Sequence, residues 1–156
     1  MRIVSGGQTG ADRAALDTAL DLGLESGGWV PRGRLAEDGV IAERYANLVE
    51  AQSACPAVRT ELNVRDCDAT VIFSHGPLVG GSALTERLAR GYGRLLLHLD
   101  LSRMSEIEAS ATLRSWLVRH RPLALNVAGA RHSEDPGIYA ATRRVLAGAL
   151  AGEGRC

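Results

Sequence analysis

A glycine-rich loop near the N-terminus has the composition of an anion-binding site. Residues 5–12, SGGQTGAD, follow a short apolar run and precede a segment with helical periodicity. Glycines let the backbone approach an anion closely, and a helix N-terminus adds partial positive charge to the free N–H groups of the turn. The loop has neither the Gly-Lys-Ser/Thr of a Walker loop nor the GxGxxG spacing. It predicts a phosphate or other oxyanion site, and a plain strand-to-helix turn is the alternative.

A second glycine loop, GGSALTE at residues 80–86, repeats this pattern. Gly80 and Gly81 permit a close backbone approach, Ser82 is expected to cap the helix that starts there, and Thr85 can add a hydroxyl contact one turn later. A Gly-Gly turn with Ser82 as its helix cap is the alternative interpretation. Two such junctions in one short chain favour a ligand that carries phosphate or another oxyanion.

Charged residues near these loops suggest further contacts. Arg32, in the turn PRGR, has the planar guanidinium that binds phosphate or molybdate oxygens in pairs, although an arginine in a turn is often only solvated. Glu37 and Asp38 are candidates to hold a metal, a ribose or a pterin amine. The alternative is that both side chains simply face water. His75 and His132 have no HxxxH or His/Cys cluster beside them, so a metal site is not expected. Asp66 and Asp68, which flank Cys67, are expected to orient the start of the next strand.

Short apolar runs alternate with helical patterns, and this alternation determines how the loops are positioned. Strands are expected at residues 2–4, 28–30, 69–74, 95–99 and 123–128, and helices at 11–22, 59–66 and 82–90, from Ser105 and from Asp135. Gly23 should end the first helix, Ser105 and Glu108 fit a capping box, and Asp135-Pro136 fits an N-cap followed by a first-turn proline. Residues 31–50 are polar, turn-rich and only weakly periodic. Inward-facing positions are expected at Ala15, Leu16, Ala19 and Leu20 of the first helix, at Ala109, Leu113, Trp116 and Leu117 of the fourth, and at Ile138, Ala141, Val145, Leu146 and Ala149 of the last.

This alternation predicts a single Rossmann-like α/β domain over residues 1–151, a mainly parallel sheet with helices on both faces, followed by a loose tail at 152–156. Ligands of such sheets bind beyond the carboxyl ends of the strands. The loops at 5–12, 31–39, 74–86 and 129–137 each follow an expected strand. We therefore expect all of them to converge on one edge of the sheet.

Composition narrows the classes of partner. Lys and Arg together number 18 and so do Asp and Glu, and aromatic residues make up 4%, so a nucleic-acid surface is not expected. No apolar stretch approaches the roughly 18–20 residues of a membrane span. The odd number of cysteines, the lack of a CxxC pair and the lack of a signal-peptide pattern predict a cytoplasmic protein.

Several segments closely resemble one family. SGGQTGADRAALD, GGWVPRGRLAEDG, RTELNVRDCDATVIFS, GGSALT and NVAGARHSEDPGI, in this order from residue 3 to about residue 138, resemble the putative molybdenum cofactor carrier proteins. These belong to the circularly permuted YpsA-type branch of the SLOG superfamily, whose Rossmann-like domains bind nucleotide-derived ligands. Cys67 stands where relatives often have serine, and Ser82 where they often have threonine. The resemblance implies that the pocket is lined by Gly6, Gly7, Gln8, Thr9, Gly10, Arg32, Gly80, Gly81, Ser82 and Thr85.

The resemblance also implies a function. The expected ligand is molybdenum cofactor, a phosphorylated pterin that holds molybdenum through a dithiolene, or a related phosphorylated pterin or nucleotide. The expected protein is a carrier without catalytic activity, a homo-oligomer, with molybdoenzymes or cofactor-synthesis proteins as partners.

Two other functions stay open. The related lonely-guy enzymes cleave N-glycosidic bonds of nucleotides, and a similar hydrolase or phosphoribohydrolase would use Glu86, Asp12 or Glu37 as acid or base. However, GGSALTE departs from the spacing PGGxGTxxE of those enzymes. A sensor of a nucleotide signal is the other possibility. Abundant anion-binding backbone without a clear acid–base pair favours the carrier.

Overall fold

Parallel strands form the central sheet of the computed structural model, which describes residues 1–151. In this range one sheet has six strands in the order β5-β2-β1-β8-β6-β7, and every neighbouring pair is parallel. The strands are β1 (Arg2–Val4), β2 (Ser26–Val30), β5 (Leu48–Glu50), β6 (Ala69–Ser74), β7 (Leu95–Asp100) and β8 (Ala124–Gly129). A separate antiparallel hairpin joins β3 (Leu35–Ala36) to β4 (Gly39–Val40).

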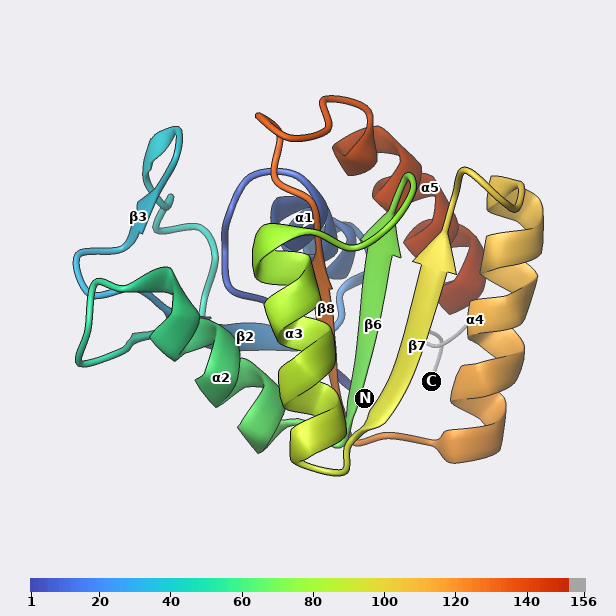
Figure 1. Cartoon of the computed structure of the whole chain (residues 1–156), viewed down its shortest axis with the longest axis horizontal. Coiled ribbons are helices and arrows are strands. Elements are labelled where there is room, and N and C mark those ends of the chain that lie inside the picture. Colours follow the sequence, from blue (N-terminus) through green and yellow to red (C-terminus); the bar gives the residue numbers. More distant parts are fainter. Residues whose placement is uncertain (152–156) are drawn as a thin grey trace.

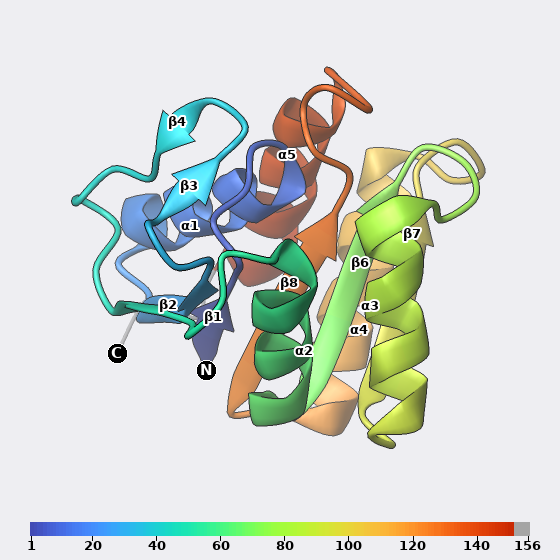
Figure 2. The same ribbon diagram turned by 60° about the vertical axis from the view of Figure 1, so that its left-hand side comes forward.

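Helices cover both faces of the sheet, which confirms the expected Rossmann-like arrangement. The helices are α1 (Ala11–Leu22), α2 (Pro56–Asp66), α3 (Gly80–Gly91), α4 (Glu106–His120) and α5 (Ile138–Leu150). On one face α5 packs between α1 and α4, and on the other α2 packs against α3 (Figures 1 and 2). Within residues 1–151, no helix combines the length and the apolar character needed to cross a bilayer. The tail expected at 152–156 lies outside the described residues.

Strand β6 lies in the middle of the core, and all six of its residues are buried. Because successive side chains of a strand alternate between faces, Val71 and Phe73 join the cluster under α1, α4 and α5, which also contains Leu113 and Leu146. A smaller cluster of Leu16, Val30, Ile41 and Tyr45 fixes the segment after β2.

Local signals set most helix ends. Gly23 ends α1 with a left-handed φ of 66°, and Ser105 and Glu108 form the expected capping box of α4. Two expected caps are wrong. Helix α3 begins at Gly80 with Val79 as its N-cap, so Ser82 lies inside the first turn. Helix α5 begins at Ile138, because the Asp135 carboxylate accepts from the Gly137 N–H (3.1 Å) in a turn that precedes the helix.

Leu20 was expected to face inward but is 43% exposed. It lies at the border of the buried stripe of α1, where periodicity alone does not distinguish core from surface. The remaining inward positions of α1 and α5 are buried, and Trp116 of α4 packs against the core while staying partly exposed.

Residues 31–50 contain the hairpin and the edge strand β5, neither of which the sequence analysis expected. The strands are two or three residues long, and Arg34 and Asn47 have left-handed φ values of 56° and 59°. Such short pieces carry no periodicity. The segment is held instead by buried Ile41 and Tyr45 and by polar contacts to the first glycine loop.

Candidate functional site

A cavity of about 420 Å³ lies between α2, α3 and the carboxyl end of β8. The chain runs outward from β1 through β2 to β5 on one side of the sheet, whereas β8, β6 and β7 lie on the other side of β1. The cavity is thus near the point at which the strand order changes direction, the usual ligand position in such folds. We call it the main cavity.

The structure brings only some of the predicted residues into the main cavity. Gly6, Gln8, Gly80, Gly81, Ser82 and Thr85 line it, so both glycine loops contribute. Thr9 and Gly10 line a second cavity on the opposite side of the loop. A Cβ added to Gly7 would lie 2.8 Å from the Cδ1 atom of Ile41, so this glycine faces the smaller core cluster. Arg32 lines neither cavity; its side chain is exposed and its backbone N–H donates to the Ser53 carbonyl (3.0 Å).

Arg59 is the main residue that the sequence analysis missed. It lies on α2, is only 8% exposed, and lines the main cavity. Its Nη1 donates to the carbonyl oxygen of Gly6 at 2.5 Å, and its Nε to Oγ1 of Thr60 at 3.3 Å. No carboxylate in residues 1–151 forms an ion pair with it. The available signal was its position: Arg59 lies four residues before buried Asn63, on the same face of α2.

Asp12 places a carboxyl group in the same cavity. Its Oδ2 accepts from the Gln8 N–H at 3.2 Å. Removal from water raises the pKa of Asp12 above its ordinary value, and the positive charges of Arg59 and Arg13 and the Gln8 N–H only partly offset this. Asp12 is therefore a carboxyl group that gains a proton more readily than an exposed aspartate.

The other cavity cations come from α3 and from the loop after β8. Arg87 lines the cavity from α3, and Arg131 lines it while paired with Glu134 (2.7 Å). The N–H groups of Gly80 and Gly81 donate to no other group in residues 1–151, and the first turn of α3 holds no acidic residue. These features together make one side of the cavity attractive to an anion.

Glu37 lies outside the main cavity and joins three loops. Its carboxylate accepts from the hydroxyl of Thr9 and from both the N–H (3.0 Å) and the hydroxyl (2.6 Å) of Ser133. These donors, assisted by Arg131, lower the pKa of Glu37 to about 2. The carboxylate is thus fully engaged within the protein. We call this contact the Glu37 latch.

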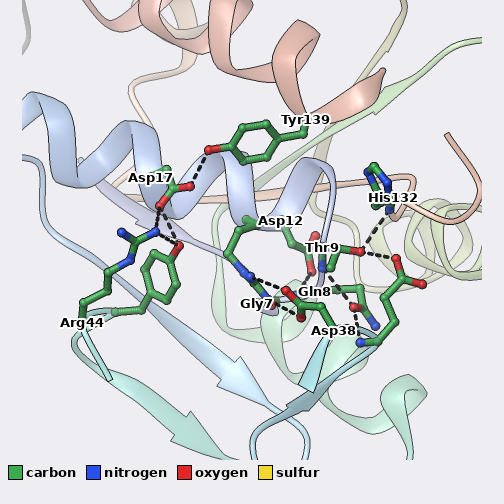
Figure 3. Close-up of polar contacts among 12 residues, drawn as sticks. Gly7, Gln8, Thr9, Asp12, Asp17, Asp38, Arg44, His132 and Tyr139 are labelled. Carbon is green, nitrogen blue, oxygen red and sulfur yellow. Dashed lines mark hydrogen bonds and ion pairs between the residues drawn. The ribbon is translucent and has the colours of Figure 1, made fainter. Parts of the chain in front are cut away.

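Neighbouring polar contacts support the same loops. Asp38 pairs with Arg13, which also donates to the Gly7 carbonyl oxygen at 3.1 Å. Figure 3 shows Gln8 and Thr9 beside the hairpin, with the His132 backbone approaching Thr9. The hairpin is therefore fastened to the first glycine loop.

Of the carboxylates considered as acid or base, Asp12 alone lines the main cavity. Glu37 is engaged in the latch. Glu86 pairs with Arg90 at 3.4 Å on the outer surface of α3.

The second cavity, of about 360 Å³, is lined largely by polar groups that pair with one another. Asp17 accepts from the hydroxyls of Tyr45 (2.6 Å) and Tyr139 (2.5 Å) and pairs with Arg44 (3.1 Å), as Figure 3 shows. These contacts tie α1 to α5 and to the segment before β5.

The remaining candidates also have structural partners. His75 pairs with Asp135 (2.6 Å), and no group of three or more possible metal ligands occurs in residues 1–151. Asp68 accepts from the N–H groups of Leu123 and Ala124 (2.8 and 2.9 Å), which fastens the start of β8 to the start of β6. Asp66 instead pairs with Arg65 (2.7 Å) and accepts from the indole N–H of Trp29 (2.9 Å). Burial raises the pKa of the Cys67 thiol to about 12, so this cysteine is inert core.

Two comparisons with known proteins cover nearly the whole chain. The model of the circularly permutated YpsA SLOG family matches residues 3–150. The 1.45 Å crystal structure of a protein from Syntrophus aciditrophicus SB, named putative molybdenum carrier protein, is similar with a TM-score of 0.93 and 51% sequence identity, over 96% of this chain and 94% of that one. No curated protein matches. The family match includes every residue that lines the main cavity.

Proposed function

Because the chain belongs to the circularly permutated YpsA SLOG family, we propose that it binds and carries a small phosphorylated ligand in the main cavity. The ligand is molybdenum cofactor or a related phosphorylated pterin or nucleotide. The relative that is 51% identical is named a molybdenum carrier, which supports the first of these. The cavity volume of about 420 Å³ lies within the range of roughly 300–1,000 Å³ typical of small-molecule sites.

The observation that carries the proposal is the environment of Arg59. Arg59 is a largely buried residue, 8% exposed, and a buried cation costs free energy unless negative groups compensate it. No carboxylate of residues 1–151 forms an ion pair with it, and its guanidinium donates only to neutral oxygens while the charge of Asp12 acts on it from elsewhere in the cavity. An anionic group of a ligand in the cavity would supply this partner. The free N–H groups of Gly80 and Gly81 add donors for the same class of group.

The groups that line the main cavity fit a carrier better than an enzyme. Asp12 is accompanied there by Glu134, which is already paired with Arg131, so two free groups for acid and base catalysis do not face each other. We further expect a homo-oligomer in the cytoplasm that delivers its ligand to molybdoenzymes or cofactor-synthesis proteins.

The raised pKa of Asp12 favours one second candidate, hydrolysis of a nucleotide-derived ligand. A hydrolase would release free base or phosphate from nucleoside monophosphates at a rate that falls in Asp12→Asn. A carrier would return these compounds unchanged.

The experiment for the carrier begins with native mass spectrometry of protein purified from its own host, which identifies a co-purifying pterin or nucleotide. Calorimetry with that compound then compares the wild type with Arg59→Gln, Gly81→Val and Arg32→Ala. Loss of a charge-assisted hydrogen bond in Arg59→Gln should cost about 1.5–3 kcal/mol of binding free energy. Gly81→Val should abolish binding, because the space beside Gly81 is open and its Cβ would enter the cavity.

Arg32→Ala is the matched control, since it removes an arginine that lines neither cavity. Its affinity should equal that of the wild type. Unchanged affinity in both Arg59→Gln and Gly81→Val, with the fold intact by circular dichroism, would contradict the proposal.

A further inference from the structure

The main cavity combines a buried cation with a carboxyl group at the same end. Arg59 donates to the carbonyl of Gly6, and Asp12 accepts from the N–H of Gln8, so both side chains hold the same turn of the first glycine loop. Only Oδ2 of Asp12 has a partner; its Oδ1 accepts from no donor in residues 1–151. An unpaired carboxyl oxygen therefore stands in a site whose other features attract anions.

A carboxylate in an anion site discriminates between anions by their protons. It repels an oxyanion that is fully ionised, but it accepts a strong hydrogen bond from an oxyanion that still carries an O–H group. A phosphomonoester has its second pKa near about 6 and keeps or regains such a proton easily. Sulfate and molybdate carry no proton at neutral pH, so they cannot donate a hydrogen bond to the Asp12 carboxylate.

We propose that the main cavity is selective for phosphate groups that bring a proton, and that Asp12 determines this specificity while Arg59 binds the ionised oxygens. This inference rests on the proposed function and narrows it. The group recognised on the cargo is its phosphomonoester, and a bare oxyanion of molybdenum is rejected.

The charges around Asp12 are compatible with a shared proton. Removal from water raises the pKa of Asp12, and the positive charges of Arg59 on α2 and Arg13 on α1 lower it by less. Across the cavity lie Arg87 on α3 and Arg131, which Glu134 neutralises. A bound phosphate adds negative charge beside Arg59 and so raises the pKa of Asp12 further. One proton is then held between the phosphate and Asp12, and binding weakens as pH rises and that proton is lost.

The test uses calorimetry on the full chain with inorganic phosphate, sulfate and molybdate at pH 6 and pH 8. The wild type should bind phosphate at least about tenfold more tightly than sulfate or molybdate. This is the difference expected when the hydrogen bond from phosphate to Asp12 is replaced by repulsion between Asp12 and an anion that has no proton. Its affinity for phosphate should fall about tenfold between pH 6 and pH 8.

Asp12→Asn keeps an oxygen for the Gln8 N–H and offers an amide donor to the cavity. It should bind sulfate and molybdate at least about tenfold more tightly than the wild type does and lose most of the pH dependence. Glu43→Gln is the control, because it makes a comparable change of charge at an exposed position outside the main cavity and should change neither property.

The outcomes separate the two proposals. Equal affinity of the wild type for the three anions, or a preference for molybdate, would overturn this inference and leave an Arg59-dependent anion carrier standing. If none of the anions and no co-purified ligand binds, the proposed function fails and the inference fails with it. The comparison of anions on the wild type is decisive even if Asp12→Asn does not fold.

Discussion

Nη1 of Arg59 donates a hydrogen bond to the carbonyl oxygen of Gly6 at 2.5 Å, across 53 positions of sequence. A Cβ added to Gly6 would lie 2.8 Å from the same nitrogen. The φ of Gly6 is outside the left-handed region, so backbone conformation does not require glycine there. Glycine is required there because the Arg59 guanidinium approaches so closely that a Cβ would collide with it. This contact fixes both the first glycine loop and the cation that faces the main cavity.

Gly6→Ala should therefore weaken ligand binding more than it weakens the fold. The new methyl group displaces the end of a flexible side chain, so we expect a loss of unfolding free energy below about 1.5 kcal/mol. The displaced guanidinium should lower affinity for the co-purified ligand or for phosphate by about tenfold. Urea denaturation and calorimetry measure the two effects. A normal affinity in folded Gly6→Ala would show that the position of Arg59 does not govern binding.

Gly7→Ala should have the opposite profile. Gly7 has a left-handed φ of 75°, and a Cβ there would meet Ile41 at 2.8 Å. Backbone strain and overpacking together should cost about 1–3 kcal/mol of stability, whereas affinity per folded molecule should be unchanged. Gly81→Ala is the control, because its Cβ meets no atom within 4 Å and alanine favours a helix. A lower denaturation midpoint for Gly81→Ala than for Gly7→Ala would contradict the structural role assigned to Gly7.

The fold was largely predictable because its elements carry local signals. The apolar run of β6, Gly23 at the end of α1 and the Ser105–Glu108 capping box each act within one element. Parallel pairing then brings the loops to one edge. The hairpin and β5 were missed because strands of two or three residues have no period, and their register depends on buried Ile41 and Tyr45.

The site was predictable only in part, for a related reason. Glycine motifs mark loops, and six of the predicted positions do line the main cavity: Gly6, Gln8, Gly80, Gly81, Ser82 and Thr85. Whether an arginine is buried depends on which helices pack together. Arg59 is covered because α2 packs against α3, whereas Arg32 lies in an exposed turn. The sequence patterns pointed to Arg32 and gave no reason to single out Arg59.

The expected self-association can be tested through α4. Ile107 and Val118 are 83% and 64% exposed and lie eleven residues apart, on one stripe of this helix. We expect sedimentation at micromolar concentration to show a species of at least twice the protomer mass of 16.5 kDa. Ile107→Glu should shift it toward the protomer, and Glu43→Gln on an exposed loop should not. A wild-type protomer alone would remove the prediction.

The Glu37 latch should make stability depend on pH in the acid range. Donors from Thr9 and Ser133 lower the pKa of Glu37 to about 2, whereas an unfolded glutamate has a pKa of about 4.3. Between these values the unfolded chain binds more protons than the folded chain does. The stabilisation is therefore complete above about pH 5 and is lost as pH falls toward 2.

Glu37→Gln should accordingly be less stable than the wild type at pH 7, and the difference should shrink steadily between pH 5 and pH 3. Urea midpoints measured at pH 7, 5, 4 and 3 give the comparison. Asp100, whose pKa is also lowered to about 2, contributes equally to both proteins and cancels in the difference. Glu43→Gln makes the same change of net charge at an exposed position and serves as the control. A difference in urea midpoint between the wild type and Glu37→Gln that stays constant from pH 7 to pH 3 would contradict this prediction. It would mean that the contacts to Thr9 and Ser133 do not stabilise an ionised carboxylate.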